Sequence, residues 1–445
     1  MPVRVRSAPS PTGRLHVGNI RSAALNWLFQ HREGGQFILR IDDTDVARST
    51  KEFEDGIRED LSWLGFAWAE TYKQSDRFAE YDKARDKLVA DGLLYPAYET
   101  EEELERKRRI AQARGLPPVY DRAALALTAD ERAALEKEGR KPHWRFKLSG
   151  GRSDWNDLIR GPQSVDTASL SDPVLIREDG AYLYTLPSVV DDAEMKISHI
   201  IRGEDHVTNT GVQIEIFRAL GFEPPLFAHH PLMVGADGEG LSKRLGSLSI
   251  QSMREEGYEP LAIVSHLAKI GTSDPVAAGA SLNALSADLA WEKISRAPAR
   301  YDTAEVKRVN AEVLHAMDYA TAKARLAALG ADHGEAFWNA VRANLVFFAD
   351  VKEWARVIAG PIDPVIADAA FASAAAEALP AGPYDSAAWN SFVDAVKTKT
   401  GAKGRALFMP LRQALTGMDH GPEMAPLFAL IGPEKARARL MGQAA

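Results

Sequence analysis

A turn rich in proline and glycine, residues 7–19, has the composition of a phosphate-binding loop. It lies between a short strand predicted at 3–5 and a helix that the spacing of apolar residues predicts over 20–32. Free N–H groups and the positive end of the helix dipole would attract phosphate there. Gly13 and Gly18 let a ligand approach the backbone closely, and His16 adds a donor. Such turns are common, so this stretch alone leaves a phosphate site and an ordinary turn equally open.

A second glycine-rich stretch at 235–246 supplies positive charge for the same ligand. Lys243 and Arg244 stand in it. A lysine is a compact charge on a flexible stem, so it can contact a phosphate oxygen transiently. Taken alone, these two residues would be assigned to a solvated surface loop, and only their combination with the first turn favours phosphate chemistry.

Two arginines and an aspartate stand at the ends of predicted strands. Arg202 ends an apolar strand at 197–202, Asp42 follows a second apolar run, and Arg6 follows the first strand. Ligands of open parallel sheets bind beyond the carboxyl ends of the strands, so the three side chains would meet. Three acids so close together at 42–45 repel one another, which favours a cation or an amine ligand nearby. A helix cap is the alternative for the acids of 42–45, although a cap needs only one acid.

The elements that position these residues predict an α/β fold. Strand, polar turn and helix occur near the N-terminus and again over 197–220, which fits a split, doubly wound nucleotide fold. Charged helices at 101–113 and 128–138 and a hairpin around Asp179-Gly180 predict an inserted α+β unit. Helical patterns dominate from 250 onward. The expected divisions are 1–92 with 184–250, 93–183, 251–299 and 300–445.

Composition limits the possible functions. The 445 residues exceed one core, so we expect two to four domains. The chain has no cysteine, which excludes disulfides and thiolate metal sites. His229 and His230 are adjacent on a strand predicted over 226–234 and point to opposite faces, so they do not favour a metal site. No apolar run is long enough to span a bilayer and the first residues lack an apolar signal core, so we expect no membrane partner. The absence of cysteine permits any compartment and fits a cytoplasmic protein.

The net charge of −8 means that nucleic acid could bind only at local basic patches. One patch lies in the first 40 residues. A second is a candidate contact for a phosphate backbone, with a solvated helix face as an equally good explanation; it consists of Lys397, Lys399, Lys403 and Arg405.

These stretches together resemble a known family. Residues 6–13 with His16-Val17-Gly18-Asn19 are similar to the HIGH signature of class I aminoacyl-tRNA synthetases, and Leu241-Ser242-Lys243-Arg244 is similar to their KMSKS signature. Further motifs resemble bacterial glutamyl-tRNA synthetases in particular, and they lie at 8–13, 40–45, 201–206 and 408–417. The resemblance covers nearly the whole chain.

The resemblance implies a split Rossmann-type catalytic domain, an inserted acceptor-binding domain, a connecting domain that contacts the tRNA stem, and an all-α C-terminal anticodon-binding region. The implied enzyme is a glutamate–tRNA ligase. ATP and L-glutamate would give glutamyl-adenylate and pyrophosphate, and the glutamyl group would pass to the 3′ end of tRNA(Glu) with release of AMP. The resemblance also implies a monomer located in the cytoplasm. It leaves undecided whether tRNA(Gln) is a second acceptor.

The same resemblance implies site residues. His16 and Lys243 would be catalytic. ATP, as its Mg²⁺ complex, would be bound by Thr12, Gly13, His16, Gly18, Asn19, Lys243 and Arg244. Glutamate would be bound by Arg6, Ser10, Asp42, Tyr184 and Arg202. The protein itself would hold no metal.

Two departures from the family pattern matter. Position 42 is Asp where many relatives carry Glu, so its reach to the substrate ammonium is shorter. Some relatives bind zinc in the insertion through cysteines near the equivalents of Ala97 and Glu99, and this chain has none, so we expect no zinc.

Four alternative functions fit the sequence less well. A truncated relative that modifies tRNA(Asp) lacks a helical C-terminal region, and a glutaminyl enzyme usually carries β-barrels there, whereas 300–445 looks helical. A small-molecule nucleotidylyltransferase needs neither the insertion nor the tail. A non-catalytic paralogue need not retain His16 and Lys243.

Overall fold

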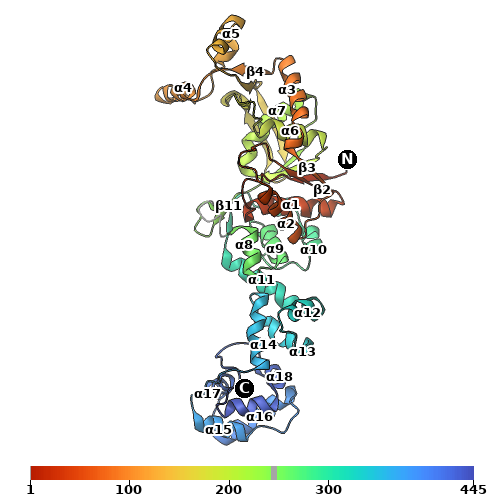
Figure 1. Cartoon of the computed structure of the whole chain (residues 1–445), viewed down its shortest axis with the longest axis vertical. Coiled ribbons are helices and arrows are strands. Elements are labelled where there is room, and N and C mark those ends of the chain that lie inside the picture. The colour runs from red at the N-terminus through yellow and green to blue at the C-terminus, as the bar shows by residue number, and fades with distance from the viewer. Residues whose placement is uncertain (1, 242–247) are drawn as a thin grey trace. The chain divides into compact units, whose positions relative to one another are not determined.

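The computed structural model describes residues 2–241 and 248–445 (Figure 1). The chain divides into two compact units, residues 1–256 with 263–302 and residues 257–262 with 303–445. The finer, four-part division expected from the sequence stays a prediction. None of the described helices is long and apolar enough to cross a lipid bilayer.

A parallel three-stranded sheet begins the first unit. Its order is β1 (Arg4–Ser7), β2 (Gln36–Ile41) and β3 (Glu70–Lys73). The central strand β2 is buried over five of its six residues, as expected of a parallel strand covered on both faces. The helices that follow the three strands are α1 (Val17–Glu33), α2 (Lys51–Trp63) and α3 (Phe78–Ala90).

A second parallel pair completes the nucleotide fold, as the sequence predicted. It consists of β9 (His199–Gly203) and β10 (Leu226–His230), with α6 (Thr185–Glu194) and α7 (Val207–Leu220) beside them. The Ser198 N–H donates to the Arg4 carbonyl at 2.8 Å, which joins β9 to β1. The carboxyl ends of β1 and β9 therefore lie at the same edge.

One predicted strand is wrong in its extent. The apolar run over 226–234 is not a single strand, because β10 ends before Pro231 and β11 (Met233–Gly235) pairs instead with β12 (Ala299–Tyr301). Proline lacks the N–H that a continuous ladder would need.

The inserted unit contains two separate antiparallel sheets. The first has the order β4 (Leu94–Ala97), β5 (His143–Phe146) and β8 (Val174–Ile176). The predicted hairpin around Asp179-Gly180 is confirmed by an antiparallel bridge between Ile176 and Tyr182. The predicted charged helices are confirmed as α4 (Glu101–Ala113) and α5 (Ala129–Lys137), each begun by a threonine capping box.

The second inserted sheet was not predicted. It is a two-stranded ribbon of β6 (Arg152–Asp157) and β7 (Gly161–Asp166). The ribbon packs on the nucleotide fold, where the Leu158 N–H donates to the Phe227 carbonyl at 2.9 Å. Its six-residue strands are mostly polar and carry little of the apolar alternation that marks a strand in sequence.

Helices follow the nucleotide fold. They begin with α8 (Ile250–Glu256), α9 (Pro260–Lys269) and α10 (Leu282–Asp288). Over 303–445, all of which the structure describes, every regular element is helical, as the sequence predicted. These α-helices are α11 (Thr303–Ala316), α12 (Tyr319–Ala328), α13 (Glu335–Val341), α14 (Val351–Ala359), α15 (Ala369–Glu377), α16 (Ser386–Thr400), α17 (Arg405–Thr416) and α18 (Met424–Leu440).

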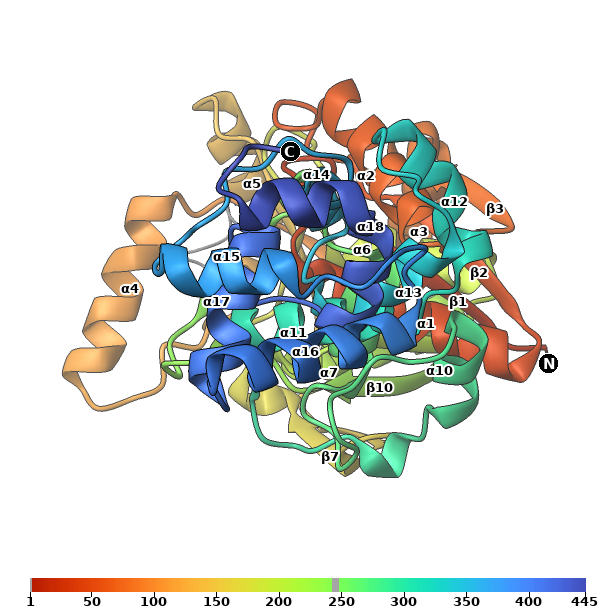
Figure 2. The ribbon, with the colours of Figure 1, turned by 90° about the horizontal axis from the view of Figure 1, so that it is seen from below.

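Helices α15, α16 and α18 lie side by side within the second unit (Figure 2). Their shared core contains Phe392 and Phe428, whose rings stack with centroids 5.1 Å apart. Trp338 and Phe337 of α13 are also fully buried.

The close contact between α7 and the ribbon gives a stability prediction. A Cβ at Gly211 would lie 2.6 Å from the Val165 Cβ, so Gly211→Ala must push α7 and β7 apart and should destabilise the protein by about 1–3 kcal/mol. Gly56 in α2 is the matched control, because a Cβ there meets no atom within 4 Å. Gly56→Ala should instead stabilise by about 0.5–1 kcal/mol. Thermal unfolding of both variants would measure this, and shifts of the same sign would contradict the packing.

Candidate active site

The turn predicted to bind phosphate begins α1 with a capping arrangement. The His16 Nδ1 accepts the Gly18 N–H at 3.0 Å, and the Asn19 Oδ1 accepts the His16 N–H at 3.3 Å. Because Nδ1 accepts, the neutral imidazole carries its proton on Nε2 and can donate it to a ligand. Burial lowers the pKa of His16, which favours this neutral form. A Cβ at Gly18 would lie 2.7 Å from the His16 ring, so the close approach requires glycine.

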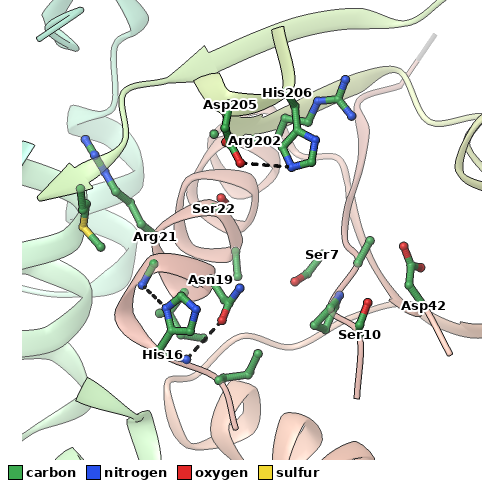
Figure 3. Close-up of a pocket in the computed structure, with 18 of the residues that line it drawn as sticks. Ser7, Ser10, His16, Asn19, Arg21, Ser22, Asp42, Arg202, Asp205 and His206 are labelled. Carbon is green, nitrogen blue, oxygen red and sulfur yellow. Dashed lines mark hydrogen bonds and ion pairs between the residues drawn. The ribbon is translucent and has the colours of Figure 1, made fainter. Parts of the chain in front are cut away.

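A cavity of about 1120 Å³ opens beside this turn, at the carboxyl ends of β1 and β9. Figure 3 shows His16 and Asn19 at the start of α1, Arg202 near the end of β9, and His206 in the short 3-10 helix that follows β9. Every predicted site residue that the structure describes lines this cavity: Arg6, Ser10, Thr12, Gly13, His16, Gly18, Asn19, Asp42, Tyr184 and Arg202. The predicted phosphate turn and amino-acid residues therefore share one cavity.

The predicted catalytic Lys243 and its neighbour Arg244 lie outside the described residues. The segments on either side of them reach the cavity, which Leu241 and Ser249 both line. Ser249 also pairs with His16 in an antiparallel bridge. The two signature stretches are thus brought together at their described ends.

The acids at 42–45 do not cap a helix, so that alternative is wrong. Thr50 caps α2 by accepting the Phe53 N–H at 3.2 Å. Asp43 instead accepts from the Ser75 N–H and hydroxyl at 2.8 and 2.7 Å. Asp42 lies in the cavity and accepts from Arg40 at 2.6 and 3.1 Å. A ligand ammonium at Asp42 would share that carboxylate with Arg40.

Burial raises the pKa of Asp42 to about 6, although the Arg40 guanidinium opposes the change and the neighbouring acids Asp191 and Asp192 add to it. The Asp42 carboxyl therefore ionises as the pH rises through about 6.

Arg6 is held by a buried carboxylate that sequence reasoning missed. The Nε and Nη2 groups of Arg6 donate to the two carboxylate oxygens of Asp192 at 2.9 and 3.3 Å. Arg40 donates to the same carboxylate at 2.8 Å. Burial opposes the charge on Asp192, but the two guanidinium groups outweigh it and hold its pKa below the usual value. The signal was available as two adjacent acids, Asp191 and Asp192, directly after the apolar residues Val189 and Val190 of the same helix.

Arg202 has a different environment. It donates to the Tyr184 hydroxyl at 3.0 Å, to Thr210 at 2.6 Å and to Gln213 at 2.7 Å. Its Nε lies 3.4 Å from the His229 Nε2. Among the described residues no carboxylate lies within hydrogen-bond distance of Arg202, so its positive charge is not matched by a direct partner. The partners Thr210, Gln213 and His229 were also missed, because no spacing in the sequence ties them to Arg202.

The family model described as "tRNA synthetases class I (E and Q), catalytic domain" matches residues 2–301, which include all the residues of this cavity. The chain belongs to this class I tRNA synthetase family. A second model, "Anticodon binding domain", matches residues 315–443, within the helical unit of this synthetase. The predicted fold class and family are therefore confirmed.

Relatives of this synthetase match it over nearly its full length. The chain is 60% identical to Glutamate–tRNA ligase 1 of Maricaulis maris over 99% of this chain and 100% of that protein. It is 60% identical to Glutamate–tRNA ligase 2 of a Methylobacterium species over 99% of each. The crystal structure of a glutamate tRNA ligase from Elizabethkingia meningosepticum in complex with its amino acid is similar, with a TM-score of 0.84, 28% identity and coverage of 99% of this chain and 98% of that one.

Removing the shared carboxylate should weaken the fold around the cavity. Asp192→Asn leaves two buried guanidinium groups with one fewer counter-charge, and we expect the local unfolding free energy to fall by about 3–5 kcal/mol. Hydrogen exchange of the β1 and β2 amides would measure it. The exposed pair Lys51 and Asp55 gives the control, since Asp55→Asn should change stability by less than about 1 kcal/mol. Equal protection in the two variants would contradict the role of Asp192.

Proposed function

We propose that this synthetase is a glutamate–tRNA ligase. The observation that carries the proposal is that one cavity contains both a glycine-rich helix start, which suits phosphate, and two arginines with an aspartate. The two guanidinium groups suit the carboxylates of L-glutamate, and Asp42 suits its ammonium group. The names of the full-length relatives support the same substrate and acceptor.

The reaction has two steps. A carboxylate oxygen of glutamate attacks the α-phosphorus of ATP, and pyrophosphate leaves. A ribose hydroxyl at the 3′ end of tRNA(Glu) then attacks the acyl carbon, and AMP leaves. Neither step needs a covalent enzyme intermediate, so the residues act by positioning and by stabilising charge.

His16 is proposed to donate a hydrogen bond from its Nε2–H to the ATP phosphates. Backbone N–H groups around Gly18 and Asn19 would donate to the same phosphates. Thr12 and Gly13 would line the same part of the cavity. Lys243 and Arg244 are proposed to bind the pyrophosphate oxygens as negative charge develops there.

The glutamate side of the cavity is proposed to consist of Arg6, Ser10, Asp42, Tyr184 and Arg202. ATP enters as its Mg²⁺ complex, which is a substrate. The absence of a zinc site, a monomeric state and a cytoplasmic location stay predictions, and tRNA(Gln) stays open as a second acceptor.

Side-by-side charging tests the proposal. The purified protein should attach glutamate to tRNA(Glu), with glutamate preferred to glutamine by about 100-fold or more, because an amide leaves buried guanidinium charge unmatched. ATP–pyrophosphate exchange with each amino acid, with and without tRNA, measures the activation step. Parallel reactions with tRNA(Gln) would show whether that tRNA is also an acceptor. Preference for glutamine, or exchange with neither amino acid, would overturn the proposal.

The pH profile tests Asp42. Its ionised form is needed to bind the substrate ammonium, and its pKa is raised to about 6. The kcat/KM for glutamate should therefore fall about tenfold for each pH unit below that value, because this ratio reports the free enzyme. In Asp42→Asn the ratio should be low at every pH and lack the inflection. The kcat/KM for ATP at saturating glutamate serves as control. Parallel profiles for wild type and variant would remove Asp42 from the site.

A further inference from the structure

The inserted ribbon contacts the amino-acid side of the cavity through one buried pair. Asp157, the last residue of β6, accepts the Nδ1–H of His229 on β10 at 2.5 Å, and it accepts the His229 backbone N–H at 3.1 Å. Both side chains are completely buried. A residue of the insertion thus fixes a residue of the nucleotide fold.

The bond to Asp157 decides which nitrogen of His229 is protonated. A carboxylate at Nδ1 requires a proton there, which leaves Nε2 of the neutral ring as an acceptor. That acceptor lies 2.9 Å from the Thr210 hydroxyl and 3.4 Å from the Arg202 Nε. Burial lowers the pKa of His229 against the opposing pull of Asp157, so the ring stays neutral.

A neutral acceptor has a particular value beside Arg202. The hydrogen-bond partners of Arg202 in the described structure are uncharged, whereas Arg6 is paired with the carboxylate of Asp192. A carboxylate in place of His229 would hold Arg202 equally well but would neutralise it. A histidine locked in this tautomer orients the guanidinium and leaves its charge available for a ligand carboxylate.

We propose that Asp157 and His229 are positioning residues for Arg202, through which the inserted ribbon sets the selection of a carboxylate over an amide. This inference rests on the proposed glutamate–tRNA ligase activity. Arg202 would bind the substrate equally in the ground and transition states, so the pair should act on glutamate binding more than on turnover.

Two amide side chains at position 229, each of which reaches the place of one ring nitrogen, separate two roles of His229. One role is to orient Arg202, and the other is only to bind Asp157. The glutamine amide reaches the place of Nε2 and can accept from Arg202, but it loses the bond to Asp157. The asparagine amide reaches only the place of Nδ1, so it keeps the bond to Asp157 but offers Arg202 nothing. His229→Asn should therefore raise the KM for glutamate by about tenfold to 100-fold, with kcat and the KM for ATP changed less than about threefold. In His229→Gln most of this rise in the KM for glutamate should be absent, because Arg202 keeps an acceptor.

Changing the carboxylate tests the tautomer. Asp157→Asn keeps the shape and can still accept the Ile159 and Arg160 N–H groups, which the carboxylate accepts at 3.0 and 2.9 Å. Its amide would donate to Nδ1 of His229, move the ring proton to Nε2 and oppose the donors of Arg202. We expect the KM for glutamate to rise about tenfold or more, and the preference for glutamate over glutamine to shrink by a similar factor.

The buried Asp172 of the same insertion is the matched control. It accepts from Tyr95, Arg122 and the Leu148 N–H at 2.7, 2.8 and 3.0 Å. Asp172→Asn should lower thermal stability without changing the KM for glutamate.

Steady-state charging of tRNA(Glu) by all these variants gives the answer, with the melting temperature of each as a check on folding. The inference would be overturned, with the ligase activity intact, if His229→Asn had a lower KM for glutamate than His229→Gln. An unchanged KM for glutamate in Asp157→Asn would also overturn it. A wild-type protein that charges no glutamate would overturn both.

Discussion

One buried group of charges fixes the geometry on one side of the cavity. Asp192 of α6 lies between the guanidinium groups of Arg6 on β1 and Arg40 on β2, and Arg40 continues to Asp42. Charges taken out of water are stable only when they are matched and hydrogen-bonded, so none of these side chains can turn away without cost. The two strands and the helix are thereby held at one spacing.

The two cavity arginines serve different ends because their partners differ. Arg6 is partly neutralised by Asp192, which makes it a rigid part of the wall. Arg202 is bound by hydroxyl, amide and imidazole groups and keeps its charge. Desolvation lowers the pKa of Arg202, which reflects the cost of holding a buried cation without a direct counter-ion. A carboxylate ligand would relieve that cost, and an amide would not.

The sequence predicted the parts of the site that depend on local chain geometry. The strand, turn and helix around His16, the acid after β2 and the arginine at the end of β9 all follow from apolar periodicity and turn residues. The ribbon of β6 and β7 was not predicted because its strands are mostly polar. The partners of Arg6 and Arg202 could not be predicted, because they approach the two arginines only after distant segments of the chain pack together. These partners include Asp192, Thr210 and His229. Capping was misassigned to the acids at 42–45, since Thr50 performs it.

The packing of the ribbon bears on how this family could exchange its modules. Leu158 bonds to β10, Val165 lies against Gly211 of α7, and Asp157 holds His229. The ribbon therefore belongs physically to the nucleotide fold, although it is interleaved with the β4–β5–β8 sheet along the chain. A chimaera that replaced the whole insertion would break these joints, whereas one that exchanged only the segment with α4 and α5 would leave them intact. The segment that could be exchanged without breaking these contacts therefore has its boundaries inside the insertion and not at its ends.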